Sequence, residues 1–367
     1  MTASVIERVC TRVGHEAWRV HDFELVRNLL SDERLARTHP DPENAARVSD
    51  SALLGVPAGD YEAEFAEHAR ARAILLPQFS PKRMRSLRPR IEALTGQVLD
   101  RLARESPPAD LVAAVATPLP GLVICELLGA PAADRERLQA WTRAVGAGTD
   151  EARSAQGLAE LFEYGQALVS RKRREPGDDV ISRLCADESL QDAEIAGYAM
   201  RLLFAGYETM VMQIGQGALS LLASPGEWQA LAGELSLIDS AVEEVLRASG
   251  TSGGGIPRYA RTGLMIGGVH IQAGELVLLD IIAANHDPAA FERPELFDIR
   301  RVPGKHLTFG HGSTYCLGAP LARVELQVVF RELASRFPAM RLAAEVAKLR
   351  FHTDQLTGAL VELPVDW

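Results

Sequence analysis

Residues 309–318 of the 367-residue chain read Phe-Gly-His-Gly-Ser-Thr-Tyr-Cys-Leu-Gly, so Cys316 follows a glycine-rich loop and directly precedes a helical pattern. The positive end of a helix and the backbone N–H groups of such a loop stabilise a thiolate. Gly310 and Gly312 allow backbone conformations closed to other residues, and Gly318 lets a flat ligand approach the chain. By residue type alone, an isolated cysteine is more often a small buried apolar residue. The spacing around Cys316 therefore carries the interpretation.

A second stretch, residues 192–222, predicts a long helix that is apolar on nearly every side and therefore buried in protein. In its middle, residues 205–209 read Ala-Gly-Tyr-Glu-Thr. A carboxylate such as Glu208 is costly there unless it meets water or a partner. Gly206 costs about 1 kcal/mol relative to alanine in a helix, which indicates that something needs the space. The alternative is a tolerated kink in which Thr209 bonds back to its own helix.

Around these two stretches, hydrophobic periodicity predicts a mostly helical chain with a few short strands. Asp22 is a plausible N-cap for a helix over residues 23–30. Strands at 269–271 and 276–282, separated by Ala273-Gly274, indicate a hairpin. Further helices are expected over residues 62–75, 90–104, 120–128 and 321–337, and over 133–174 as two helices with a break at 146–148.

The composition, 47% hydrophobic and 24% charged, is typical of a soluble globular chain. Acidic residues outnumber basic ones by 49 to 39, and the net charge of -10 argues against a nucleic-acid partner. No charge-free apolar stretch of about 18 residues is present, so we expect no membrane span. The four cysteines form no Cys-x-x-Cys pair, which argues against a zinc site or a disulfide framework and suits a cytoplasmic location.

The length alone allows two or three domains. No repeat, low-complexity tract or linker separates the two halves of the sequence. We therefore expect residues 1–367 to form a single domain.

The pattern Phe-Gly-x-Gly-x-x-x-Cys-x-Gly at residues 309–318 resembles the haem-binding loop of the cytochrome P-450 family, whose cysteine is the proximal ligand of haem iron. Residues 205–209 are similar to that family's oxygen-binding motif, and the resemblance runs from about Trp18 to Trp367. It implies a mainly α (α+β) class, the single-domain cytochrome P-450 fold, helix-rich with a small β-sheet region. The implied cofactor is haem b, with dioxygen as co-substrate.

The same resemblance implies roles for individual residues. Cys316 would be the axial ligand of haem iron, an electron-rich thiolate that favours O–O cleavage. Thr209 would hydrogen-bond iron-bound dioxygen, and Glu208 with water would relay protons. Glu244 and Arg247 resemble the family's Glu-x-x-Arg pair, which contacts an arginine upstream of the haem loop, best matched here by Arg300. Expected haem contacts are the propionate donors His68, Arg72 and Arg258, with Ala205, Gly206, Phe309, Gly310, Gly312 and Gly318.

In the family that this sequence resembles, variable segments surround the substrate, and the resemblance implies that the matching segments of this chain form its pocket. Three consecutive glycines, 253–255, indicate room for a sizeable substrate, with a flexible loop as the alternative. Thr314 stands where a propionate-binding histidine is frequent, and the amino terminus is shorter than usual for the family. The expected pocket residues are Tyr207, Met210, Gly254, Gly255, Ile256 and Leu356.

The resemblance implies a haem-dependent monooxygenase that hydroxylates, epoxidises or oxidatively couples a small organic substrate of secondary metabolism. Electrons would come from a separate ferredoxin and its reductase, because no flavin domain is recognised in the chain. The acid-free basic stretch 70–90 is either the docking patch for that donor or a solvated helix face. Two alternatives remain: a haem-thiolate enzyme that inserts no oxygen, such as a peroxide user or an isomerase, and a non-catalytic haem-binding sensor.

Overall fold

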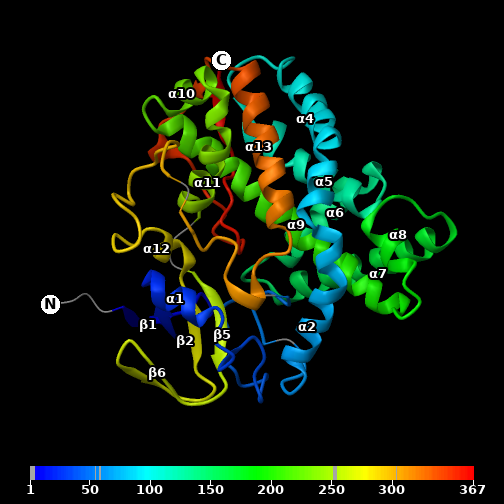
Figure 1. Ribbon diagram of the computed structural model, residues 1–367, viewed down its shortest axis with the longest axis vertical. Helices are drawn as coiled ribbons and strands as arrows, with labels where there is room; N and C mark the ends of the chain where they lie inside the picture. The colour runs from blue at the N-terminus through cyan, green and yellow to red at the C-terminus, as the bar shows by residue number, and fades with distance from the viewer. Residues whose placement is uncertain (1–4, 54, 58, 251–253, 303) are drawn as a thin grey trace.

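The computed structural model describes residues 5–53, 55–57, 59–250, 254–302 and 304–367. The molecule is helix-rich, and β1 (Ile6–Cys10), β2 (Glu16–Val20), β5 (Ile256–Ala260) and β6 (Leu264–Ile266) lie together at one end (Figure 1). The helices are α1 (Phe23–Leu29), α2 (Glu64–Leu75), α3 (Pro81–Ser86), α4 (Arg88–Leu102), α5 (Pro118–Leu128), α6 (Arg135–Val145), α7 (Glu151–Arg174), α8 (Val180–Cys185), α9 (Asp192–Ala223), α10 (Glu227–Gly233), α11 (Ile238–Ala248), α12 (Ile281–Asn285) and α13 (Ala319–Arg336).

Helix α9 is the centre of the helical part, as its apolar sequence predicts. It packs against α5, α6, α7, α11 and α13. Gly217 makes one of these contacts possible, because a Cβ there would lie 2.6 Å from Val245 of α11 and 2.7 Å from Phe330 of α13. The helices meet in a large hydrophobic core that includes residues from Leu75 to Val365.

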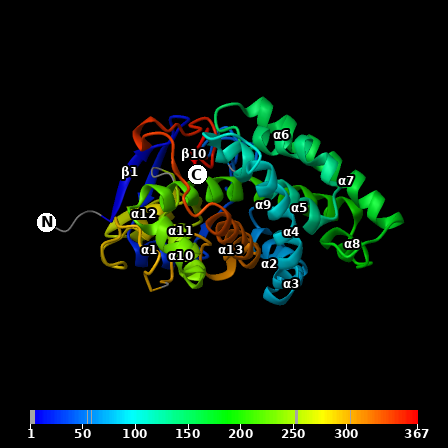
Figure 2. The same cartoon turned by 90° about the horizontal axis from the view of Figure 1, so that it is seen from above.

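Three sheets complete the structure. The five-stranded sheet has the order β1-β2-β8-β5-β3, the three-stranded sheet β4-β10-β9, and β6 and β7 pair alone. Figure 2 shows β1, α1 and α12 at one end of the molecule and α6, α7 and α8 at the other. The strands are β1 (Ile6–Cys10), β2 (Glu16–Val20), β3 (Leu35–Ala36), β4 (Ala109–Asp110), β5 (Ile256–Ala260), β6 (Leu264–Ile266), β7 (Val269–Ile271), β8 (Leu276–Leu279), β9 (Arg341–Leu342) and β10 (Pro364–Asp366).

The helices expected from the sequence are confirmed, with ends that differ by up to two residues. The side chain of Asp22 accepts a hydrogen bond from the Leu25 N–H at 2.8 Å and so caps α1. The expected break at 146–148 separates α6 from α7.

The expected hairpin is wrong in its pairing. β7 pairs with β6, across Gly267 and Gly268, which have φ values of 56° and 85°. Two consecutive residues with positive φ form the kind of tight turn that joins antiparallel strands. β8 instead lies between β2 and β5, at the centre of the large sheet.

The described part of the chain contains no helix that is both long and apolar enough to cross a membrane.

Candidate functional site

The loop before α13 has the shape that its glycines allow. Gly310 and Gly312 have φ values of 71° and 66°, and a Cβ at Gly312 would collide with the side chain of Ser31. The N–H of Cys316 donates to the carbonyl of Phe309 at 2.8 Å, which closes the loop on itself. Cys316 is exposed at the end of this closed loop.

The sulfur of Cys316 lies at the amino end of α13. Although Cys316 has exposed surface, the atoms packed around its thiol bury it enough to raise its pKa. Hydrogen bonds from the backbone N–H groups of Gly318 and Ala319 oppose this shift. The positive charges of Arg72 and Arg323 oppose it as well. All four groups favour the thiolate form, which is the form that binds metals. This arrangement agrees with the role expected for Cys316.

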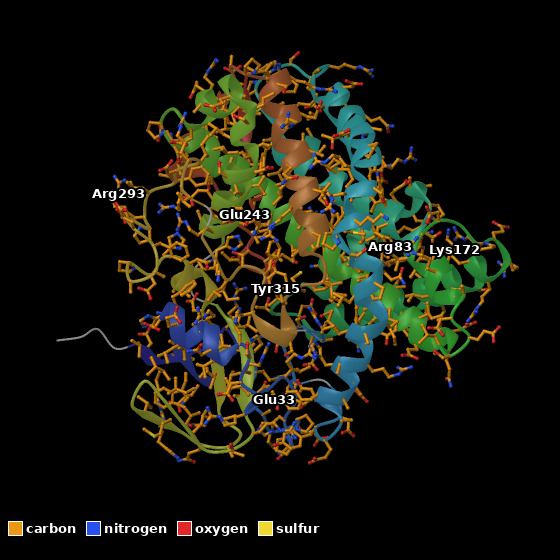
Figure 3. The ribbon with its side chains drawn as sticks, viewed as in Figure 1. Glu33, Arg83, Lys172, Glu243, Arg293 and Tyr315 are labelled. Atoms are coloured by element: carbon orange, nitrogen blue, oxygen red, sulfur yellow. The ribbon has the colours of Figure 1, made fainter. Side chains whose placement is uncertain are left out.

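A network behind the loop was not expected from the sequence. Arg323 of α13 donates to both carboxylate oxygens of Glu243 in α11, at 2.6 and 3.0 Å, and to the Tyr315 hydroxyl at 3.2 Å. Its guanidinium also lies 4.6 Å from the centre of the Phe309 ring. Although burial opposes it, hydrogen bonds from His306 and Arg323 lower the pKa of Glu243 to about 2. The network fixes both ends of the loop, and Figure 3 places Tyr315 and Glu243 in the middle of the molecule.

A short stripe of α9 is exposed although the helix is otherwise largely buried. Ala205 and Thr209, one helical turn apart, are exposed, whereas Phe204, Glu208 and Met210 are buried. The Thr209 hydroxyl donates to the carbonyl of Ala205 at 2.7 Å. The back-bonded conformation that the sequence left as an alternative is therefore present. The lone pairs of the hydroxyl stay free to accept a hydrogen bond.

Glu208 is a buried acid without a local partner. Its side chain is 5% exposed, and its Oε1 has no hydrogen-bond partner among the described residues. Burial raises the pKa of Glu208 to about 7, and the charge of Arg143 in α6 opposes this shift. Arg143 is half-buried and is a further charged residue of the site that the sequence analysis missed. A carboxyl with a pKa near neutrality can hold a proton and release it at the pH of the cell.

The space at Gly206 has a packing explanation. A Cβ there would lie 2.6 Å from Cδ1 of Ile124 in α5. Gly206 thus lets α5 approach α9 closely. A contact between its backbone and a cofactor stays a prediction.

The pocket role expected for Tyr207 is wrong. Tyr207 is two residues from both Ala205 and Thr209, so at 100° per residue its side chain projects from the opposite face of α9. Its ring packs near Gly121 of α5, 3.5 Å from the position of a Cβ there, and its hydroxyl is buried without a described partner. Met210 belongs to the main hydrophobic core, and its contact with substrate stays a prediction.

Other expected pocket segments meet at the break between α6 and α7. The N–H of Leu356 donates to the carbonyl of Gly146 at 3.1 Å, and the N–H of Gly148 donates to Asp354 at 2.8 Å. Gly255 lies tightly against β8, Gly254 is exposed and Ile256 begins β5, whereas residue 253 lies outside the described residues. The pocket roles of these residues stay predictions.

The three expected propionate donors lie in one cluster. Arg258 is 7% exposed, and the only hydrogen bond described for its side chain goes to the carbonyl of Pro257 at 2.8 Å. Burial lowers the pKa of Arg258 to about 10. Burial and neighbouring guanidinium groups, including those of Arg72 and Arg258, lower the pKa of His68. Arg72 also donates to the carbonyl of Tyr315 at 2.7 Å, which ties α2 to the loop.

This donor set fits haem b. A sulfur ligand ends the glycine-rich loop, and a buried guanidinium without a described carboxylate partner is what the carboxylates of a porphyrin require. Thr314, at the position where a histidine is frequent, contributes no charge; its hydroxyl is bonded to the carbonyls of His311 at 3.2 Å and Leu30 at 3.4 Å.

The Glu-x-x-Arg pair is buried and has a different partner from the one expected. Glu244 and Arg247 form a two-pronged ion pair, with both N···O distances 2.8 Å. The third member is Arg301, whose Nε donates to Glu244 at 3.0 Å; the prediction that Arg300 fills this place is wrong. The side chain of Arg300 is exposed, and its backbone N–H donates to Asp298 at 2.9 Å. The turn over residues 298–301 therefore directs the second arginine inward.

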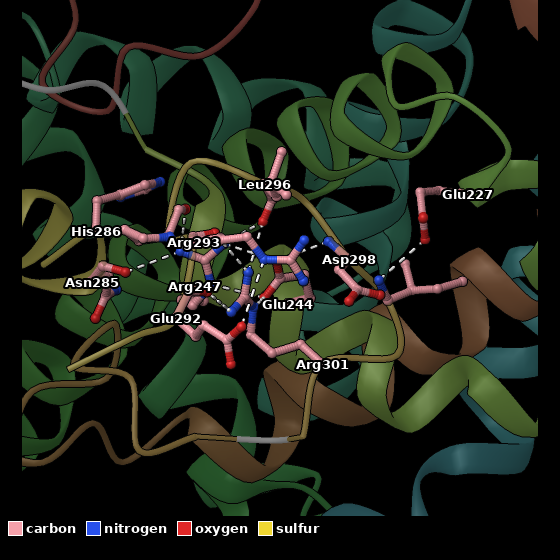
Figure 4. A network of polar contacts seen from close by, with 12 residues as sticks. Glu227, Glu244, Arg247, Asn285, His286, Glu292, Arg293, Leu296, Asp298 and Arg301 are labelled. Carbon is pink, nitrogen blue, oxygen red and sulfur yellow. Dashed lines mark hydrogen bonds and ion pairs between the residues drawn. The ribbon is translucent and has the colours of Figure 1, made fainter. Parts of the chain in front are cut away.

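Backbone carbonyls complete this network (Figure 4). Arg247 donates to the carbonyls of Asn285 and Pro294, both at 3.0 Å. Arg301 donates to those of Glu292 at 2.7 Å and Leu296 at 2.8 Å. The ion pair thus holds the long segment between α12 and the loop against α11.

Comparisons with known proteins agree with this geometry. The family model described as Cytochrome P450 matches residues 223–354. The chain is 41% identical to pentalenolactone synthase of Streptomyces exfoliatus, over 98% of this chain and 92% of the relative. It is 39% identical to mycinamicin IV hydroxylase/epoxidase of Micromonospora griseorubida, over 99% and 92%. One similar solved structure is that of the substrate-free cytochrome P450 PimD, a polyene macrolide antibiotic pimaricin epoxidase. It matches with a TM-score of 0.89 and 38% sequence identity, and the match covers 99% of this chain and 93% of that chain.

Proposed function

The chain belongs to the cytochrome P450 family. From this we propose that Cys316 would bind the iron of haem b, in a monooxygenase that hydroxylates, epoxidises or oxidatively couples a secondary metabolite. The observation that carries the proposal is the position of Cys316 at the exposed end of the loop, where its sulfur accepts hydrogen bonds from the N–H groups of Gly318 and Ala319. When bound, haem supplies the iron at which dioxygen is activated, and a thiolate ligand favours O–O cleavage.

The protein's own contribution on the cysteine side is to keep the sulfur ionised. Binding to iron requires loss of the thiol proton. Two backbone N–H groups and the charges of Arg72 and Arg323 favour that loss. The Arg323–Glu243 pair holds the loop that carries Cys316 in place.

We assign proton handling to Glu208 and Thr209 of α9. The pKa of Glu208, raised to about 7, lets its carboxyl hold a proton near neutral pH. The Thr209 hydroxyl already donates a hydrogen bond to the carbonyl of Ala205, and it can accept a hydrogen bond from a neighbouring donor. A rotation about χ1 then presents the hydroxyl as a donor on the exposed stripe. In this proposal the Glu208 carboxyl is the source of the proton, and the Thr209 hydroxyl positions that proton by hydrogen bonding.

Replacing Thr209 with alanine is expected to uncouple reductant use from product formation. The product formed per reductant consumed should fall about tenfold or more, because a positioned proton donor is lost. A substrate for this assay is found by screening natural-product intermediates for a shift of the Soret band. The matched control is Thr209→Ser, which keeps the hydroxyl and should keep most of the coupling. Full coupling in Thr209→Ala would remove Thr209 from proton delivery.

We further propose that an acidic ferredoxin docks on α3. Much of the basic stretch 70–90 has internal partners; Arg70, for example, pairs with Glu194, and Arg90 pairs with Glu126. Within the stretch 70–90, the exposed cations without a described carboxylate partner are Lys82, Arg83 and Arg85. Helix α3 packs against α13, which begins just after Cys316. Complementary charge at this face would speed the encounter with an acidic donor.

The triple variant Lys82→Glu, Arg83→Glu, Arg85→Glu is expected to be reduced by ferredoxin about tenfold more slowly at low ionic strength. Reduction by dithionite, which needs no docking, should not change. The control is Arg153→Glu with Arg174→Glu at the two ends of α7, both exposed cations without a described carboxylate partner, which should leave both rates unchanged. An equal effect of the two sets of substitutions would contradict docking at α3.

We also propose that residues 1–367 act as a single domain in the cytoplasm. The main core joins residues from Leu75 to Val365, which supports one folding unit. Cys10, Cys125 and Cys185 are free thiols, as suits a reducing compartment.

A further inference from the structure

Arg37 directly follows β3, next to Arg258 in the paired strand β5. In the antiparallel pair of β3 and β5, Leu35 is opposite Ala260 and Ala36 is opposite Tyr259. The pairing ends at Ala36, and the chain bends at the next residue, Arg37, which therefore lies beside Arg258, the residue before Tyr259. Like charges that lie close together disfavour each other's charged form.

The neighbourhood of this pair is positively charged. Arg37 is the largest charge acting on Arg258, and it is also the largest charge acting on His68. Arg72 acts on His68 too. Two strands and one helix thus bring three guanidinium groups around a single histidine.

One carboxylate, Glu64, faces the cluster. Glu64 is 7% exposed and accepts hydrogen bonds from the backbone N–H groups of Arg37 at 2.9 Å and Thr38 at 3.1 Å. The Thr38 hydroxyl also donates to it. The Nε of Arg37 is 3.4 Å from Glu64, whereas the structure describes no hydrogen bond or ion pair for its terminal nitrogen atoms. Glu64 therefore fixes the backbone at Arg37 and leaves the end of the guanidinium free to bind another anion.

The charges of the cluster match a ligand with two carboxylates. When His68 is neutral, the three guanidinium groups and the one carboxylate give the cluster a net charge of two positive units. Burial and the surrounding positive charges favour the neutral form, because they lower the pKa of His68. A buried guanidinium such as that of Arg258 is strongly destabilising without a partner. A dianion placed between the strands and α2 would neutralise the whole group.

We propose that Arg37 is a further haem-binding residue, which binds a propionate of the cofactor together with Arg258. This inference rests on the proposed haem site and adds a residue on the side of the sheet, from a segment that no motif marks. Arg37 holds the carboxylate from the solvent side, since its side chain is 51% exposed, and Arg258 holds it from the buried side. Glu64 is a positioning residue that sets the backbone of Arg37.

The test is the rate of haem loss from the purified holoenzyme, followed by transfer to excess apomyoglobin. Arg37→Gln should speed haem loss roughly three- to tenfold, as for a partly exposed charge pair. Arg37→Lys, which keeps the charge, should recover part of the difference. The matched control is Arg34→Gln, three residues earlier, whose guanidinium is exposed and paired with Asp32 at 2.6 Å; its rate should equal that of the wild type.

Reconstitution with haem dimethyl ester, in which both carboxylates are neutral, tests the chemistry directly. With the ester, the wild type and Arg37→Gln should lose the cofactor at equal rates. Equal rates with ordinary haem, or a difference that persists with the ester, would overturn the role of Arg37. Failure of the wild type to bind haem at all would instead overturn the proposed function, so the two failures are distinguishable.

Discussion

Replacing Cys316 with serine is expected to abolish the red-shifted carbon-monoxide band of the reduced protein and to reduce turnover by roughly 10³-fold or more, as removal of a group central to catalysis does. A serine hydroxyl is a far weaker acid than a thiol, so the N–H groups of Gly318 and Ala319 cannot hold it ionised at neutral pH. The electron density that a thiolate gives to iron is then lost. Absorption spectroscopy of the reduced, carbon-monoxide-bound protein measures the change.

The matched control is Cys10→Ser in β1. Cys10 is also an exposed, free cysteine, but it lies in the first strand of the large sheet. Its replacement should leave both the band and turnover unchanged. A shifted band that survives in Cys316→Ser would contradict the assignment of the ligand.

The second large effect concerns stability and is expected for Glu244→Gln. Glu244 is 2% exposed and accepts from Arg247, from Arg301 and from the backbone N–H of Asp298. Removing the carboxylate charge leaves two inward-facing guanidinium groups without their counterion. Breaking a buried pair from one side costs about 3–5 kcal/mol. Denaturant unfolding of the holoprotein should show a loss of this size.

The neighbouring arginines give a paired control. Arg301→Gln removes a guanidinium whose side chain is 16% exposed and which donates to Glu244 and to backbone carbonyls, so it should destabilise the protein strongly. Arg300→Gln changes an exposed side chain and should stay within about 0.5 kcal/mol of the wild type. A larger loss for Arg300→Gln than for Arg301→Gln would contradict the network.

The sequence predicted well those features that depend on local periodicity. Helix α9 was identifiable because its apolar pattern runs for 32 residues, and the break between α6 and α7 because glycines interrupt it. The Cys316 loop was identifiable because the spacing of its glycines and its cysteine determines the conformation of the loop. The face of Tyr207 could also have been read from the sequence, since a residue two positions from Thr209 projects from the opposite side of a helix.

Features that depend on contacts between distant segments could not be predicted in this way. The partners of β8 are strands 20 to more than 250 residues earlier, so a nearby turn suggested the wrong pairing. Arg300 and Arg301 are adjacent in a segment without periodicity, and only the turn decides which one faces Glu244. Arg143 acts on Glu208 because α6 packs on α9, and Arg37 lies beside Arg258 because β3 pairs with β5.

The central claim is that the sulfur of Cys316 binds the iron of haem. X-ray absorption at the iron edge of the purified, haem-loaded wild-type protein tests it most directly, because scattering by sulfur differs from scattering by nitrogen or oxygen. We expect one sulfur atom in the coordination sphere of iron, together with the porphyrin nitrogens. A coordination sphere of nitrogen and oxygen atoms alone would contradict the claim.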